Sequence, residues 1–384
     1  MASQTATILV TGDVVVDWSF VDAHAHEDEI LDLTWFVASG NQVHAAALPG
    51  GAGRAAQIMA AAVAALPADG PVIEVIGPAL PPEVLVSPLD TRVTRSFSLV
   101  TRFPFSVDDR THRVWRLGRV WGLAPAVSPD PFLPDLGDRT VDVLAIQDVG
   151  LGYRGAPETW YPADRGLPRH VVLSTMAPFS GNDLLDDLLR RAADRLTIVV
   201  PVVELRKTGS QIGYPLSWER TAEEVESAVR AHALGRAARV VVQLELSGAV
   251  VVDRDGPTTL VFDPSASEGS WRLRHPGTMV GYQLCYLAAL APAFAAGGVV
   301  DVPEAVRRAV AASRALHRQG LGLIEEPGGA SLDYPAEAVG RALSEDPAEI
   351  IATFHPRADG ERSIIAGALG GVSPLATAEQ LAIG

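Results

Sequence analysis

The chain has 384 residues, a formal net charge of −15 and a hydrophobic content of 48%. This length and composition are enough to bury a large core, and they exclude a largely disordered chain. Acidic residues outnumber basic ones by 46 to 31, so a nucleic-acid-binding surface, which needs clustered Lys and Arg, is not expected. The single cysteine, Cys285, excludes an internal disulfide and suits a cytoplasmic protein.

The first residues, MASQTATILVTGDVVVDW, lack the basic segment and the long apolar run of a signal peptide, and they predict a strand. The longest apolar runs are Ala-rich and interrupted by Gly or Pro, so we expect no membrane span. The expected partner is therefore a small-molecule ligand, with neither nucleic acid nor membrane.

Short β-branched runs alternate with Ala- and Leu-rich helical patterns along the rest of the chain. The expected strands are VIEVIG, VDVLAIQDVG, RHVVLST, RLTIVVPVVEL and RVVVQLELSGAVVV. Because near-continuous apolar strands separated by helices are typical of a parallel sheet covered on both faces, the predicted fold class is α/β. We expect one domain over residues 1–384.

Two segments, 18–48 and 90–125, break this alternation. Stretches such as TRVTRSFSLVTRF and THRVWRLGRVW alternate polar residues with apolar or aromatic ones, which is typical of half-exposed antiparallel strands. We expect the two segments to form a small β lid inserted into the α/β body. The aromatic and basic strand THRVWRLGRVW also offers a surface through which two copies could dimerise.

Two glycine-rich turns precede helical patterns. Gly50, Gly51 and Gly53 come before AAQIMAAAVAAL, and Gly277 opens GTMVGYQLCYLAAL. Glycine lets the backbone approach a ligand closely, and the N–H groups at a helix N-terminus attract anions. A tight turn without a ligand is the alternative at both positions.

The order of these features resembles the ribokinase-like (PfkB) sugar and nucleoside kinases: an opening strand with Asp17, then a lid, then the Gly50–Gly51 turn. The resemblance implies a ribokinase-like fold, with a carboxylate at Asp17 that binds substrate hydroxyls and a glycine turn that packs against the sugar. Charge-assisted hydrogen bonds make a carboxylate well suited to that task. Alternatively, Asp13 and Asp17 only end a strand.

The resemblance extends to three further strands. Asp148 ends a strand that also ends in Asp in the family, and Glu204 falls on the Glu of an Asn-x-x-Glu motif, which makes it the candidate Mg²⁺ ligand, although Pro201 replaces the Asn. The nucleotide motif Thr-x-Gly-x-x-Gly falls on Gln243, Glu245 and Gly248. A carboxylate at Glu245 would repel a polyphosphate, which counts against ordinary ATP binding.

The family signature Gly-Ala-Gly-Asp corresponds to Gly277-Thr278-Met279-Val280, so Gly277 and Thr278 keep the expected anion site while Val280 replaces the catalytic base. Valine accepts no proton, and no Asp or Glu lies between Glu268 and Asp301. General-base help of this kind contributes about 10² to 10⁴ in rate.

Three functions stay open. The first is a kinase-impaired protein that binds a sugar, nucleoside or nucleotide as a sensor or regulatory module. The second is an active kinase, using ATP and Mg²⁺, with Asp148, Glu204 or Asp263 as a displaced base. The third is an interaction domain that dimerises through the lid. Residues 204–226 are predicted to form a loop whose role stays open. The capping-box pattern Thr221-x-x-Glu224 predicts that a helix begins at its end.

Overall fold

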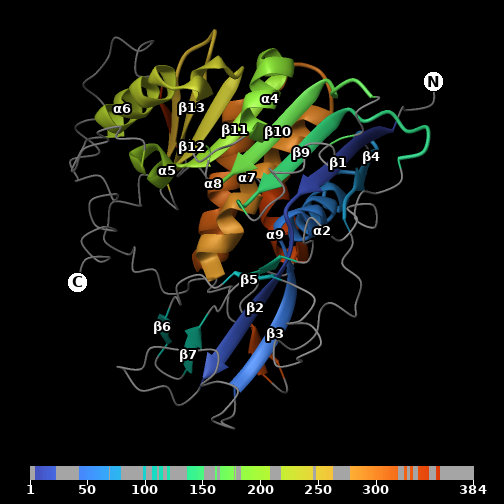
Figure 1. Ribbon diagram of the computed structural model, residues 1–384, viewed down its shortest axis with the longest axis vertical. Helices are drawn as coiled ribbons and strands as arrows, with labels where there is room; N and C mark the ends of the chain where they lie inside the picture. Colours follow the sequence, from blue (N-terminus) through green and yellow to red (C-terminus); the bar gives the residue numbers. More distant parts are fainter. Residues whose placement is uncertain are drawn as a thin grey trace.

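The computed structural model (Figure 1) describes the greater part of the α/β body and the strands of a second sheet. The described residues are 5–22, 43–68, 70–78, 98–100, 106–109, 112–115, 119–121, 136–150, 161, 165–176, 178, 183–207, 218–244, 248–262, 277–318, 324–326, 329–331, 336–345 and 352–354.

Nine strands of the described residues form one sheet in the order β17-β14-β13-β12-β11-β10-β9-β1-β4. The strands from β4 to β12 pair in parallel, and the strands from β12 to β17 pair antiparallel. The predicted class, an α/β fold with a mostly parallel sheet flanked by helices, is therefore confirmed. The bounds are β1 Ala6–Gly12, β4 Ile73–Ile76, β9 Val143–Asp148, β10 His170–Thr175, β11 Leu196–Pro201, β12 Arg239–Gln243, β13 Gly248–Asp253, β14 Thr259–Phe262 and β17 Ala352–Phe354.

Helices cover both faces of this sheet (Figure 1). One face packs against α2 (Gly51–Ala64), α7 (Gly277–Ala295), α8 (Val302–Arg318) and α9 (Ala336–Ser344). The other face packs against α4 (Asp183–Arg191), α5 (Val202–Lys207) and α6 (Trp218–Ala231), with short 3₁₀ turns at η4 (Ala193–Arg195) and η5 (Ala233–Arg236). Strands buried on both faces explain the continuous apolar runs in the sequence.

The pattern of α4 shows how a sequence of this kind selects a helix. Its four leucines are buried, at positions 184, 185, 188 and 189, whereas acidic residues occupy the first turn and Arg190 and Arg191 the last. The apolar spacing makes one buried stripe, and the charges oppose the helix dipole at both ends.

The segments with alternating polarity contribute strands to a second sheet, drawn at the bottom of Figure 1. Its strands are β2 (Val14–Asp22), β3 (Val43–Gly50), β5 (Ser98–Val100), β6 (Ser106–Asp109), β7 (His112–Trp115) and β8 (Arg119–Trp121). β15 (Ile324–Glu326) and β16 (Gly329–Ser331) form a separate pair. A role of the second sheet as a lid or a dimer surface stays a prediction.

Two apolar runs expected to be single strands are each two strands. The opening run divides at Asp13, because Gly12 has a φ of +130° and β2 pairs within the second sheet. The run RVVVQLELSGAVVV is a hairpin in which β12 and β13 pair antiparallel. In both places a glycine with positive φ turns the chain, since only glycine adopts that backbone readily.

Two helix boundaries also differ from the prediction. The strand at residue 196 ends at Pro201, so Glu204 lies in the first turn of α5. Helix α6 begins at Trp218, and Thr221 is buried inside it. Glu224 pairs with Arg220 at 2.8 Å, which replaces the expected capping box with an ion pair along the helix. Among the described residues, no helix combines the length and apolar character needed to cross a membrane.

Candidate functional site

Asp13 joins three elements at the carboxyl edge of the parallel sheet. Its side-chain Oδ2 accepts the N–H of Val149 at 2.7 Å, just beyond β9. Its own N–H donates to the Gln147 carbonyl at 2.9 Å, and its carbonyl accepts the N–H of Ala52, in α2, at 2.8 Å. Asp13 is only 1% exposed. It therefore fixes the ends of β1 and β9 and the start of α2 relative to one another.

The start of α2 lies beside the start of β2. Gly50 is the N-cap of α2 and pairs with Val15, while Gly51 has a φ of +54° and forms a bridge with Val14. Asp17 is two residues farther along β2, or about 7 Å at the usual rise of a strand. The backbone register thus brings Asp17, Gly50 and Gly51 close together, and their role in ligand binding stays a prediction.

Asp17 does not end a strand. It lies in the interior of β2, where its register partners are Leu48 of β3 and Arg119 of β8. The alternative reading, in which Asp13 and Asp17 only terminate the opening strand, is wrong for Asp17. Asp13 does follow the last residue of β1, but its hydrogen bonds give it a larger structural role.

Helix α7 begins at Gly277, as the glycine turn predicted, and its first turn contains no acidic residue. Helices α2 and α7 pack together, and their last turns line the same pocket, so Gly51 and Gly277 lie toward the same end of the two helices. The first N–H groups of α7 have no partner within the helix and suit an anion. Val280 lies in that first turn, at the position expected for a base.

The three alternative bases differ in their placement. Asp148 is fully buried at the end of β9, where its carboxylate accepts the Thr175 hydroxyl at 2.6 Å and the Gly150 N–H at 3.0 Å. Glu204 is 6% exposed. Asp263 lies outside the described residues, as does Glu245. The burial and hydrogen bonds of Asp148 favour a structural role at the sheet edge.

Mg²⁺ and ATP are the expected cofactors, and Glu204 is the residue expected to hold the metal. Within the described ranges, no three His, Cys, Asp or Glu side chains form a group able to hold a metal ion. Mg²⁺ is often held by one or two carboxylates together with ligand phosphates and water. Glu204 therefore fits Mg²⁺ only as part of such a ligand complex.

Gln243 and Gly248 lie near the turn of the β12–β13 hairpin, where the register partner of Gln243 is Ala249. The carbonyl of Gly248 accepts the Leu244 N–H at 2.9 Å and the Tyr286 hydroxyl at 3.1 Å, and a Cβ at Gly248 would overlap the Val261 carbonyl oxygen. Gln243 is 1% exposed, and within the described chain neither Oε1 nor Nε2 of its amide has a hydrogen-bond partner. Close packing against Val261 explains the glycine at position 248. The fold alone does not explain why the amide of Gln243 is buried without a hydrogen-bond partner.

The sequence did not identify Asp13 as the residue that joins the ends of β1 and β9 to the start of α2. Its partner Val149 is 136 residues away, and a short motif such as TGD carries no sign of that contact. The available signal was a charged residue between two apolar runs, because a buried carboxylate must be hydrogen-bonded.

No protein-family model matches the chain, and no curated protein matches it. Solved structures similar to it include an adenosine kinase from Trypanosoma brucei brucei, at 14% identity and a TM-score of 0.47 over 80% of this chain and 98% of that one. A ribokinase from Cryptococcus neoformans var. grubii, solved with ADP, shares 12% identity, with a TM-score of 0.47 over 89% and 99%. A mutant phosphofructokinase-2 from Escherichia coli shares 14% identity, with a TM-score of 0.48 over 88% and 99%. These values describe a similarity of overall shape.

Proposed function

We propose that the protein binds a small polyhydroxylated ligand, a sugar, nucleoside or nucleotide, and that it is kinase-impaired and acts as a sensor or regulatory module. The first turn of α7 carries this proposal, because it contains no acidic residue where the ribokinase-like pattern has its base. The residues proposed for ligand binding, Asp17 and the Gly50–Gly51 turn, meanwhile share one edge through the register of β2 and β3.

Each proposed binding residue supplies a different contact. Asp17 would accept hydrogen bonds from ligand hydroxyls, and Gly50 and Gly51 would let the ring approach the backbone. The N–H groups at Gly277 and Thr278 would hold an anionic group such as a nucleotide phosphate. Gln243 and Gly248 lie on the proposed nucleotide side, where the unpartnered amide of Gln243 could meet a polar ligand.

An active kinase is the second candidate, and Glu204 is the observation that favours it. This carboxylate lies in the first turn of α5, directly after β11, where it could join a Mg²⁺–ATP complex. When bound, Mg²⁺ would supply charge neutralisation for phosphoryl transfer. The cytoplasmic location and a homodimer through the second sheet are further expectations of both candidates.

Calorimetry with adenosine, ribose, fructose and ATP tests the binding proposal. We expect at least one of these ligands to bind the wild-type chain, and Asp17→Asn to weaken that binding about tenfold or more, since it removes a charge-assisted contact. Asp22→Asn, at the far end of the same strand, is the matched control and should bind as wild type does. An Asp17→Asn chain that binds every ligand unchanged would remove Asp17 from the site.

A further inference from the structure

A cavity lies at the other end of α2 and α7, away from the proposed ligand site. It has a volume of about 320 Å³, which falls within the range of small-molecule sites. Pro292 is 15 residues beyond Gly277, so this part of α7 is about 22 Å from its N-terminus. The cavity is thus separate from the edge that carries Asp17.

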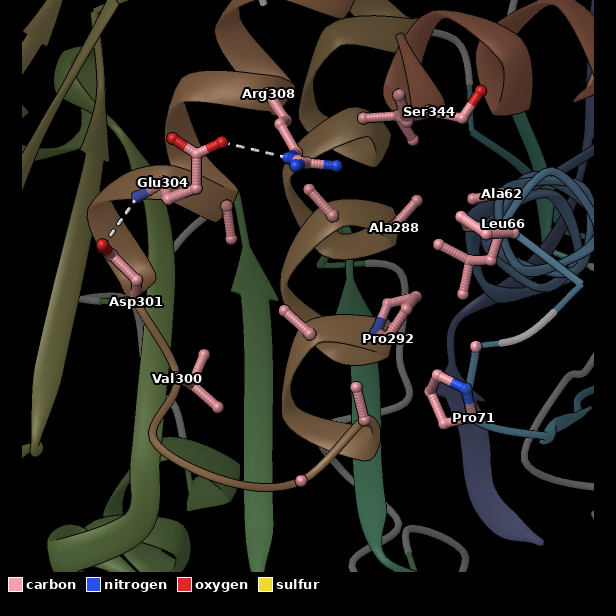
Figure 2. A pocket seen from close by; sticks show the side chains of 18 of the residues that line it. Ala62, Leu66, Pro71, Ala288, Pro292, Val300, Asp301, Glu304, Arg308 and Ser344 are labelled. Atoms are coloured by element: carbon pink, nitrogen blue, oxygen red, sulfur yellow. Dashed lines mark hydrogen bonds and ion pairs between the residues drawn. The ribbon is translucent and has the colours of Figure 1, made fainter. Parts of the chain in front are cut away.

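The walls of the cavity are mostly apolar. Figure 2 shows Ala62 and Leu66 of the α2 end on one side and Ala288 and Pro292 of α7 behind. Ala288 and Pro292 are buried, whereas Leu66 is half-buried, so apolar surface is open to a ligand at the mouth. A ligand with an apolar body would remove this surface from water.

One cation points into the cavity. Arg308 of α8 is held through Nε, which donates to Glu304 Oε1 at 3.1 Å. Among the described residues, the guanidinium forms an ion pair with Glu304, and neither terminal nitrogen, Nη1 or Nη2, donates a hydrogen bond. Figure 2 shows the guanidinium reaching across the cavity toward Ser344 of α9. A guanidinium held in this way presents two parallel donors, the geometry that a carboxylate accepts.

The neighbouring charges leave Arg308 able to take an anion. Glu304 is shared, because its Oε2 also accepts Arg307 Nε at 2.7 Å. Burial alone would raise the pKa of Glu304, but hydrogen bonds from Arg307 and Arg308 bring it below its ordinary value. Asp301, on the rim, accepts the Glu304 N–H at 3.0 Å and caps α8. The carboxylates of Glu304 and Asp301 therefore both accept hydrogen bonds, and they lie on the side of Arg308 away from Ser344 (Figure 2).

We propose that this cavity binds a small monocarboxylate with an apolar body, such as a medium-chain or aromatic acid. The carboxylate lies against Nη1 and Nη2 of Arg308, and the apolar body lies against Leu66, Ala288 and Pro292. A cation is disfavoured, because the positively charged Arg308 lines the cavity. A neutral apolar molecule would leave the two donors of Arg308 without a partner.

Octanoate is the probe, and calorimetry on the full chain is the measurement. We expect octanoate to bind wild type at least about tenfold more tightly than 1-octanol, which has the same chain without the charge. Arg308→Gln should lose about tenfold or more in octanoate affinity, and Arg307→Gln should lose little, since Arg307 shares Glu304 but does not line the cavity.

The position of the bound probe is checked by NMR of the alanine methyl groups. Octanoate should shift the signals of Ala288 and Ala289, which line the cavity, and leave Ala222, buried on the opposite face of the sheet, unchanged. Equal binding of octanoate and 1-octanol to wild type overturns the proposal even where a variant fails to fold. Absence of octanoate binding, or full binding by a folded Arg308→Gln chain, also overturns it.

Discussion

The carboxylate of Asp13 accepts the backbone N–H of Val149 at 2.7 Å, and this contact joins residues 136 positions apart at the edge where we place the ligand site. The same residue binds the first turn of α2 through its carbonyl. The geometry of the Gly50–Gly51 turn therefore depends on a carboxylate that is buried beneath it.

Asp13→Ala should lower the free energy of unfolding by about 2 to 3 kcal/mol, because the Val149 N–H is left buried without its acceptor. Urea unfolding followed by circular dichroism measures this change. Asp138→Ala, at an exposed position, is the control and should change stability by less than about 0.5 kcal/mol. Equal stability of the two variants would contradict the role assigned to Asp13.

Gly248→Ala should destabilise the chain by about 2 kcal/mol or more, since its Cβ would overlap backbone of β14 and its φ of +155° disfavours a side chain. The measurement is the thermal midpoint. Gly166→Ala is the matched control, because a Cβ there meets nothing within 4 Å. A Gly248→Ala chain as stable as this control would show that packing does not require glycine at β13.

Gln243→Met should raise the free energy of unfolding by about 1 kcal/mol in the absence of ligand, because a buried amide without partners is replaced by an apolar side chain of similar size. Denaturant unfolding of the two chains tests this. If Gln243 also contacts a nucleotide, the same variant should bind ATP more weakly. A large loss of stability would mean that the amide has partners in the folded chain.

The free energy of unfolding should fall in mild acid, because protonation of His170 is less favourable in the folded chain than in the unfolded chain. Burial, followed by the charges of Arg169 and Arg239, lowers the pKa of His170, whose ring stacks on Phe294 at 4.7 Å. As the pH falls below about 6.5, His170 takes up a proton in the unfolded chain, whereas the folded chain keeps the ring neutral until a lower pH. The contribution of His170 to the free energy of unfolding is therefore present at higher pH and is lost as the pH falls below that value. His170→Gln should reduce the loss of stability between neutral and mildly acidic pH. Identical pH profiles for wild type and His170→Gln would contradict this assignment.

Val280→Asp should create or increase phosphoryl transfer to the ligand that the wild-type chain binds, because it places a carboxylate in the first turn of α7. An increase of about tenfold or more is expected, short of the full effect of an evolved base. Val280→Asn has nearly the same shape and no basic group, so it should stay at the wild-type rate. Equal rates for the Asp and Asn variants would show that position 280 does not face the acceptor.

Most of the fold could be predicted from the sequence, because strands buried on both faces leave long apolar runs and α2, α4 and α7 have strong local patterns. The divisions at Asp13 and before Gly248 could not, since each run is apolar on both sides of the turn. The turn at Asp13 depends on pairing with a strand far away in the chain, β2 with β8, and the turn before Gly248 depends on the pairing of β13 with both β12 and β14. The Arg308 cavity likewise brings together four helices and carries no short motif.

The most direct measurement of the central claim is ATP turnover by the wild-type chain in the presence of Mg²⁺ and whichever sugar or nucleoside it binds in calorimetry. The account predicts saturable binding that depends on Asp17, with no turnover above the rate without acceptor. Turnover that requires both Mg²⁺ and the bound ligand would contradict it and would favour an active kinase with a displaced base.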